Sequence, residues 1–317
     1  MIRNLFFALC LCAGGAWAQS YPSKPVHIVV PYGTGGPADI YARFLGAKLQ
    51  ETLGQPFVIE DRPGAGSIVG TDAVAKSAAD GYTLLMMSNT HTVNETLIAK
   101  KPFELMRDLA PITGVNYSDL LMVIHPSVPA NNLKEFIAYA KANPGKLNYA
   151  SSGNGTPYHM AGELFKAMAG VDLVHIPHKG SDQARAAVLG GQVQMMFDAV
   201  PTMAANAAAG KVKALATTGS KRSPVTPNIP TLSEAGVPGY ESGIWLGMMA
   251  PAGTPRPVLE EINAAVNKII NSADVKAAWA KQGAYPMGMS IDQFDKFLRE
   301  EIVKWAKVVK LSGAKVD

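Results

Sequence analysis

The chain has 317 residues, of which 48% are hydrophobic and 17% are charged, and its formal net charge is +4. This composition excludes an intrinsically disordered chain, and a chain of this length usually folds into two domains. The small positive excess contains no basic block, so it gives no support for nucleic-acid binding and only weakly favours an acidic ligand.

The first 18 residues have the features of a secretory signal. Arg3 precedes an apolar run, residues 5–11, and Ala16-Trp17-Ala18 matches an A-x-A cleavage pattern. We therefore expect cleavage after Ala18 and a periplasmic protein, with a membrane anchor or a buried N-terminal helix as the alternatives. The mature chain would have no disulfide and no cysteine metal ligand, because Cys10 and Cys12 both lie in this segment. No later run reaches 18 apolar residues, so we expect no transmembrane helix.

The next part of the chain alternates between strand and helix patterns, which predicts a parallel α/β unit. The expected strands are Val26–Val30, Phe57–Glu60 and Tyr82–Met87, and the expected helices run from Ile40 to Leu53 and from Ile68 to Ala79. Ligands of such sheets bind at the carboxyl ends of the strands. Three loops are predicted to meet there, at residues 31–39, 61–67 and 88–94.

The loop Pro31–Asp39 is typical of an anion site. Its glycines allow a close approach of the backbone to a ligand, and Pro37 suits the first position of a helix. The free N–H groups at a helix start, together with the helix dipole, attract a negative charge. We expect this loop to hold a carboxylate.

A second unit is predicted to begin near Leu120 and to repeat this design. Its strand Leu147–Ala150 leads into the loop Ser151–Pro157, and helical spacing follows as far as Gly170. Two such loops, one in each unit, suggest an anion held from both sides. The remaining predicted elements of this unit are a helix at Leu133–Ala142, a strand at Val171–Ile176, a helix at Ser181–Leu189, a strand at Val193–Phe197 that ends at Asp198, a helix at Pro201–Ala209 and a strand at Val212–Thr217.

The chain is then expected to return to the first unit. A proline-rich tether at Ser223–Gly239 precedes a strand at Ile244–Met249. Three helix patterns follow, at Pro257–Asn271, Ala273–Gln282 and Ile291–Leu311. The predicted arrangement is residues 19–120 plus 243–317 as a discontinuous first domain and residues 121–242 as an inserted second domain, with strands that cross between them as a hinge.

Several motifs stand in order along nearly the whole mature chain and resemble the Bug family, the TctC-like substrate-binding receptors of tripartite tricarboxylate transporters. They are Tyr21-Pro22-Ser23-Lys24-Pro25, Gly35-Gly36-Pro37 with Asp39, Asp61-Arg62-Pro63-Gly64-Ala65-Gly66, Asp80-Gly81-Tyr82-Thr83-Leu84, Ala140–Leu147 and Pro251-Ala252-Gly253-Thr254-Pro255. The resemblance implies an α/β fold, that of a two-domain periplasmic binding protein of type II with its ligand in the interdomain cleft. It also implies no catalysis, no cofactor and no metal, and a small mono- or dicarboxylate that is passed to membrane transporter subunits. We expect a monomer.

Carried over by position, the resemblance implies a set of ligand-binding residues. They are Tyr32, Gly33, Thr34, Gly35, Gly36 and Asp39 in the first loop, Ser88, Asn89 and Thr90 between the loops, Ser151, Ser152, Gly153, Gly155 and Thr156 in the second loop, His159 behind it, and Asp198. The chain departs from the family pattern at Ala38, at His178 and at Asn94-Glu95. These departures prevent the ligand of any relative from being transferred to this chain.

Three of these residues have alternative roles that the sequence leaves open. Asp39 could order the pocket or only stabilise the first helical turn, and Asp198 could accept a ligand hydrogen or only cap a turn before Pro201. His159 could contact the ligand or pack internally. The methionine pairs are expected to fill cores.

Other functions are compatible with single motifs. Gly33-x-Gly35-x-x-Ala38 matches a dinucleotide-binding fingerprint, although Asp39 would repel a pyrophosphate, and the loop could also be a plain turn. His175-x-x-His178 has no third metal ligand nearby. The alternatives to a transport receptor are an exported sensor subunit for a membrane histidine kinase and, more remotely, a dinucleotide-dependent enzyme.

Overall fold

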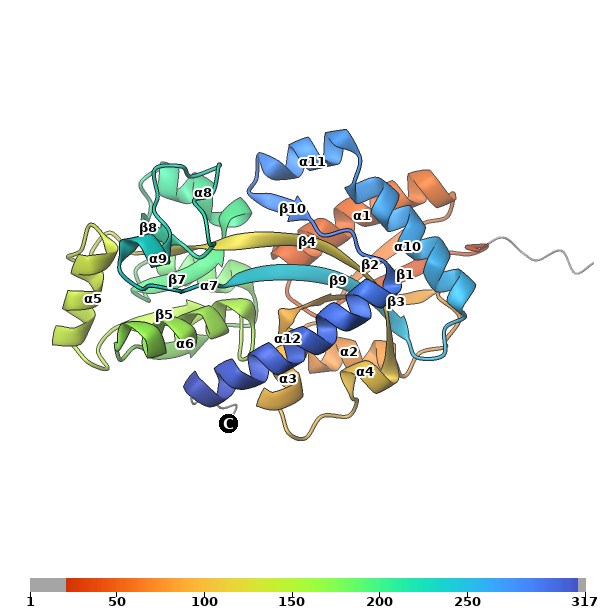
Figure 1. Ribbon diagram of the computed structural model, residues 1–317, viewed down its shortest axis with the longest axis horizontal. Coiled ribbons are helices and arrows are strands. Elements are labelled where there is room, and N and C mark those ends of the chain that lie inside the picture. The colour runs from red at the N-terminus through yellow and green to blue at the C-terminus, as the bar shows by residue number, and fades with distance from the viewer. Residues whose placement is uncertain (1–20, 313–317) are drawn as a thin grey trace, which may run out of the picture.

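The computed structural model describes residues 21–312, and the predicted signal segment lies outside them. Ten strands of this part of the chain form one sheet, in which eight pair in the order β2-β1-β3-β9-β4-β7-β5-β6, and β8 and β10 pair with β4 off this path. Figure 1 shows two lobes that share the long central strands β4 and β9.

The first lobe combines parallel strands with helices from both ends of the chain. Its elements are β1 (Val26–Val30), α1 (Pro37–Leu53), β2 (Phe57–Asp61), α2 (Ile68–Ala75), β3 (Thr83–Ser88), α3 (Asn89–Leu97), α4 (Leu105–Asp108), α10 (Arg256–Ile270), α11 (Ala273–Ala280), β10 (Ala284–Pro286) and α12 (Ile291–Ser312). β1 pairs in parallel with both β2 and β3, as the alternating pattern predicts.

The second lobe is built from the middle of the chain. Its elements are α5 (Leu133–Ala142), β5 (Asn148–Ser151), α6 (Pro157–Ala169), β6 (Val174–Pro177), α7 (Ser181–Leu189), β7 (Met195–Ala199), α8 (Val200–Ala208), β8 (Lys213–Thr217) and α9 (Leu232–Ala235). β5 pairs in parallel with β6 and β7. The carboxyl ends of β5 and β6 therefore lie at one edge, as do those of β1, β2 and β3 in the first lobe.

Two strands join the lobes. β4 (Leu109–Ile124) pairs with β9 (Gly243–Pro251) along its first part and with β7 and β8 along its last part. All residues of β9 are buried. The central strands are thus covered on both faces, which explains their apolar sequences.

The helices that matter for the site begin and end where the sequence predicts. Pro37 and Pro157 occupy the first turns of α1 and α6. Gly54 and Gly170 end these helices with φ of 76° and 64°, a conformation that glycine adopts without a steric penalty. The predicted strand–loop–helix modules in both lobes are confirmed.

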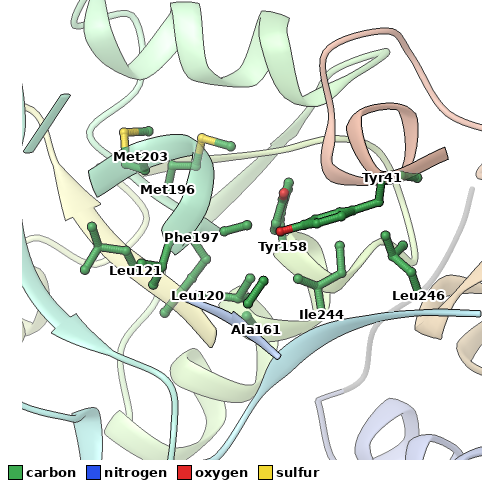
Figure 2. Packing of buried hydrophobic residues seen from close by; sticks show 14 of the residues in the cluster. Tyr41, Leu120, Leu121, Tyr158, Ala161, Met196, Phe197, Met203, Ile244 and Leu246 are labelled. Carbon is green, nitrogen blue, oxygen red and sulfur yellow. The ribbon is translucent and has the colours of Figure 1, made fainter. Parts of the chain in front are cut away.

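Buried side chains fill the junction of the lobes as well as their interiors. One cluster includes Tyr41 of α1, Tyr158 of α6, Leu120 of β4, and Ile244 and Leu246 of β9 (Figure 2). A second joins Val93 of α3, Met160 of α6 and Trp305 of α12. α12 therefore packs against both lobes (Figure 1).

Some element boundaries differ from the prediction. β4 begins at Leu109, although no strand is predicted between Leu109 and Leu120, a segment that contains Pro111 and Gly114. The structure accommodates these residues with shifts in register to β9. The predicted helix from Ile68 ends at Ala75 instead of Ala79, and the strand predicted at Val171–Ile176 starts three residues later. Asp198 lies within β7 instead of directly after a strand.

Candidate functional site

A cavity of about 470 Å³ lies between the lobes. It is lined by the segments that follow β1, β2 and β3 in the first lobe and β5 and β6 in the second, together with Ile244 and Leu246 of β9. This is the position where open α/β sheets bind ligands.

The structure places about half of the predicted site residues on the cavity wall. These are Tyr32, Gly33, Gly36, Ser88, Ser152, Gly153 and Thr156. The other predicted residues are not on the cavity wall. These are Thr34, Gly35, Asp39, Asn89, Thr90, Ser151, Gly155, His159 and Asp198.

Asp39 and its neighbours hold the first loop. The Asp39 carboxylate accepts a hydrogen bond of 2.9 Å from the backbone N–H of Gly35 and forms an ion pair with Arg43 one turn later. Arg43 also pairs with Asp61, which accepts a bond from the Thr34 hydroxyl. Burial and the negative charge of Asp39 raise the pKa of Asp61. These bonds fix the loop and leave the backbone N–H of Ala38, on the cavity wall, without a hydrogen bond among the described residues.

The wall beyond the first loop is a network of hydroxyl groups and one histidine. Ser88 caps α3, and its hydroxyl lies 2.6 Å from that of Tyr32. His91 reaches the Tyr32 hydroxyl through Nδ1 and the Thr71 hydroxyl through Nε2. Burial lowers the pKa of His91 to about 4 and raises the pKa of Tyr32 to about 12. Both groups are therefore neutral near pH 7.

Asn89 and Thr90 act within the protein interior. The Asn89 side-chain amide donates to the backbone carbonyl of Gly243 in β9. The Ser88 hydroxyl donates to the Thr90 hydroxyl, and the backbone N–H of Thr90 donates to the oxygen of the Ser88 hydroxyl. Asn89 thus fixes α3 to the shared strand, and Thr90 orients Ser88.

A stack of rings supports the second loop. His159 Nδ1 accepts from the backbone N–H of Gly155, and its ring stacks on His175 at a centroid distance of 4.0 Å. His175 Nε2 lies 2.6 Å from the Ser151 hydroxyl, and the ring of Tyr149 stacks on that of His175 at a centroid distance of 4.9 Å. Burial lowers the pKa of His159 to about 4 and the pKa of His175 to about 3. Both rings are neutral near pH 7, so His159 can act as an acceptor.

Asp198 is completely buried and has several partners inside the second lobe. Its carboxylate pairs with Arg185 of α7 at 2.7 Å and accepts from the Thr202 hydroxyl and the Ala199 backbone N–H. Because its charge is compensated internally, Asp198 ties α7 and α8 to β7.

Two segments of the cavity wall were absent from the predicted residue set. One is Pro63–Ser67, although its loop was expected to reach this edge. The other is His178–Ser181, at the start of α7. The sequence contains a signal for the second segment, because a strand, a glycine and a helix pattern follow one another there as they do at the other two loops.

The starts of α1, α6 and α7 converge on this cavity from both lobes. The backbone N–H groups of Ala38, Tyr158 and Ser181 near these starts have no hydrogen-bond partner among the described residues. Helix starts carry a partial positive charge, and the described wall includes Lys179 but no acidic side chain. The arrangement is suited to an anion and disfavours a cation.

The two lobes approach each other closely where Gly33 of the first lobe lies against Gly180 of the second. A Cβ atom built on Gly33 of the first loop would lie 3.3 Å from the Cα atom of Gly180 in the second lobe. A side chain at position 33 would displace Gly180 slightly. The two lobes are therefore close together in this structure.

Neither a metal-binding cluster nor a membrane-spanning helix is found in the described part of the chain. Within residues 21–312 there is no group of three or more histidine, cysteine or acidic side chains arranged to hold a metal. Nδ1 of His178 bonds the Ile176 carbonyl, and His175 bonds Ser151. None of the described helices combines the length and apolarity needed to cross a bilayer.

Two lobes joined by shared strands, with a ligand-sized cavity between them, define the class of bilobal solute-binding proteins. A family model described as the tripartite tricarboxylate transporter family receptor matches residues 41–314. The protein BugT of Bordetella pertussis is 38% identical over 317 residues, which cover 99% of this chain and 97% of BugT. The chain therefore belongs to the TctC receptor family, a family of periplasmic solute-binding proteins and not of enzymes.

Solved structures agree with this assignment. Rpa4515 of R. palustris, solved with adipate, has a TM-score of 0.90 and 33% identity, and the match covers 93% of this chain and 100% of that one. MatC from Rhodopseudomonas palustris, solved with bound malate, has a TM-score of 0.86 and 33% identity, with coverage of 91% and 100%. The expected α/β fold of a periplasmic binding protein is confirmed.

Proposed function

We propose that this protein binds one small organic mono- or dicarboxylate between its lobes and delivers it to the membrane subunits of a tripartite tricarboxylate-type transporter. The observation that carries the proposal is the convergence of three helix starts from both lobes on a cavity whose described wall has no acidic side chain. The carboxylate ligands of Rpa4515 and MatC support it.

The ligand carboxylate is held mainly by backbone groups in this proposal. The N–H groups of Ala38 and Tyr158 come from opposite lobes, so one carboxylate that bonds both would favour the closed form. Lys179 adds a positive charge at the start of α7. The apolar wall of Ile244 and Leu246 packs against the carbon skeleton.

The predicted residues divide into two roles under this proposal. The residues on the wall contact the ligand, whereas Asp39, His159 and Asp198 hold the loops and helices that carry them. Asp39 and His159 do this by accepting backbone N–H groups of the first and second loops. Fixed loops bind more tightly because less conformational entropy is lost on binding.

We also propose the domain boundaries, export and oligomeric state. Residues 19–120 with 243–317 form one domain and residues 121–242 the other, and the crossing of β4 and β9 near these boundaries supports this division. Export with cleavage after Ala18 agrees with a family of periplasmic receptors. The receptor acts as a monomer, and its partners are the transporter subunits.

A thermal-shift screen of organic acids on the purified mature protein tests the proposal. At a hundredfold excess over its dissociation constant, a specific ligand adds about 2.7 kcal/mol, which corresponds to a rise of roughly 5–10 °C in Tm. We expect one class of carboxylates to give such a rise, and amino acids and dinucleotides to give none. A response confined to amino acids or dinucleotides would contradict the proposal.

A further inference from the structure

Ser67 stands out among the residues that line the cavity because its hydroxyl is buried without a partner. The residue is 3% exposed, and its Oγ has no hydrogen bond among the described residues. It precedes α2 but makes no capping bond to it. A buried hydroxyl without a partner lowers stability, and a ligand atom that bonds it removes this cost.

The hydroxyl groups beside Ser67 already satisfy one another. Tyr32 and Ser88 share a bond of 2.6 Å, and the Ser88 hydroxyl also donates to Thr90. The Ser67 side chain lies beside the Tyr32 hydroxyl and lowers its pKa by a weak hydrogen-bonding interaction, but the contacts of the Tyr32 hydroxyl with good hydrogen-bond geometry go to Ser88 and His91, and none goes to Ser67. The Ser67 hydroxyl is therefore left for another group.

The backbone of Ser67 has a conformation that favours glycine. Its φ is 78°, and it follows Ala65 at 47° and Gly66 at 62° in the same turn. A non-glycine residue in this region is strained, and such strain is typical of residues whose side chain has a function. Glycine would adopt this backbone conformation without the steric cost that serine carries.

We propose that Ser67 is a specificity-determining residue whose hydroxyl bonds an oxygen that the ligand carries in addition to its helix-bound carboxylate. The ligand is then a hydroxy-, oxo- or dicarboxylic acid, and unsubstituted monocarboxylic acids bind more weakly. This inference rests on the proposed carboxylate function. A site with a buried hydroxyl discriminates against an analogue without the matching oxygen, because the hydroxyl then stays unpaired.

Two pairs of probes separate the possible sources of this oxygen. Malate and succinate differ by a hydroxyl group, and adipate and hexanoate differ by a second carboxylate. Isothermal titration calorimetry on the wild type identifies which difference matters. We expect the oxygen-rich member of at least one pair to bind roughly tenfold more tightly, the value of one hydrogen bond.

The variant Ser67→Gly then tests the residue itself. It removes the hydroxyl and relieves the backbone strain, so we expect an unchanged or higher Tm together with loss of that tenfold preference. Ser67→Ala should also lose the preference while keeping the strain. The matched control is Ser242→Ala, which removes another buried hydroxyl without a hydrogen-bond partner among the described residues, at a position that is not on the cavity wall, and its affinities should equal those of the wild type.

The outcomes separate the role of Ser67 from the proposed binding of a carboxylate. If Ser67→Gly discriminates between the probes as the wild type does, or if the wild type discriminates within neither pair, the role of Ser67 is wrong while carboxylate binding stands. If the wild type binds no carboxylate at all, the proposed function is wrong and the inference falls with it.

Discussion

At the scale of single residues, the site separates side chains that line the cavity from those that hold its wall in place. Asp39 illustrates the second kind. Its carboxylate joins a loop N–H and Arg43, and it is not on the cavity wall. The sequence could indicate that Asp39 belongs to the site, but it could not distinguish contact with a ligand from support of a loop, because both roles need an acid at the helix start.

Replacing Asp39 by alanine should loosen the first loop. The Gly35 N–H loses its acceptor, so we expect a loss of about 1–2 kcal/mol in stability and roughly tenfold weaker ligand binding. Calorimetry and thermal unfolding measure both effects. The matched control is Asp292→Ala, which removes an acid from the first turn of α12 far from the cavity wall and should leave affinity unchanged. Equal affinities of the wild type and Asp39→Ala would reduce Asp39 to a helix-dipole role.

At the scale of elements, the starts of the helices are positioned by buried polar groups. The second loop depends on the neutral rings of His159 and His175 beneath it. The strand, glycine and helix order at α1 and α6 was predictable because it is local in the sequence. The start of α7 was not included in the predicted residue set, although it has the same local order of strand, glycine and helix, because its position on the wall also depends on the parallel pairing of β5 and β6.

The lowered pKa values of the buried histidines His159 and His175 predict that the stability of the protein depends on pH. A free histidine binds a proton near pH 6.5, whereas the folded pKa of His159 is about 4 and that of His175 about 3. Between pH 6.5 and these folded pKa values, the unfolded state therefore binds more protons than the folded state. Their contribution to stability is complete above pH 6.5 and falls as the pH decreases toward 4.

The variant His159→Asn tests this dependence. The asparagine oxygen can still accept from Gly155, but it does not titrate. The difference in Tm between the wild type and this variant should shrink or change sign as the pH falls from 7 to 4. A difference that stays constant over this range would contradict the assignment.

The C-terminal helix is attached to the shared strand through one carboxylate. Glu301 accepts bonds of 2.8 Å from the indole N–H groups of Trp245 in β9 and Trp305 in α12. Glu301→Ala leaves both donors buried and unpaired, so we expect a loss of about 2–4 kcal/mol in the free energy of unfolding. Chemical denaturation measures it. Glu300→Ala, at an exposed ion pair, should cost less than about 0.5 kcal/mol, and a similar loss in both variants would refute the role of Glu301.

At the scale of the whole molecule, two lobes on shared strands enclose a cavity, and we propose that this cavity closes when the lobes approach each other. The repeated loop design predicts the inserted domain arrangement that we propose. The full length of β4 was not predictable, because Pro111, Gly114 and Asn116 interrupt its pattern and are accommodated only by irregular pairing with β9. That pairing depends on residues more than 100 positions away, which a local pattern does not reveal.

Crowding at the approach of the lobes should weaken ligand binding without unfolding the protein. In Gly33→Ala the new Cβ would lie 3.3 Å from Gly180, so we expect roughly tenfold weaker binding as closure becomes less favourable. Gly190→Ala is the matched control. Its Cβ would lie 3.2 Å from the backbone carbonyl oxygen of Ala186, which belongs to the same lobe as Gly190, and neither residue is on the cavity wall. An affinity loss in the control as large as in Gly33→Ala would show that the effect is not closure.

A crystal structure with the carboxylate that raises Tm most tests the central claim most directly. The account predicts a carboxylate between the lobes, with its oxygens within hydrogen-bond distance of the backbone N–H groups of Ala38 and Tyr158. A ligand bound outside this cavity, or one that presents a positively charged group to these N–H groups, would contradict it.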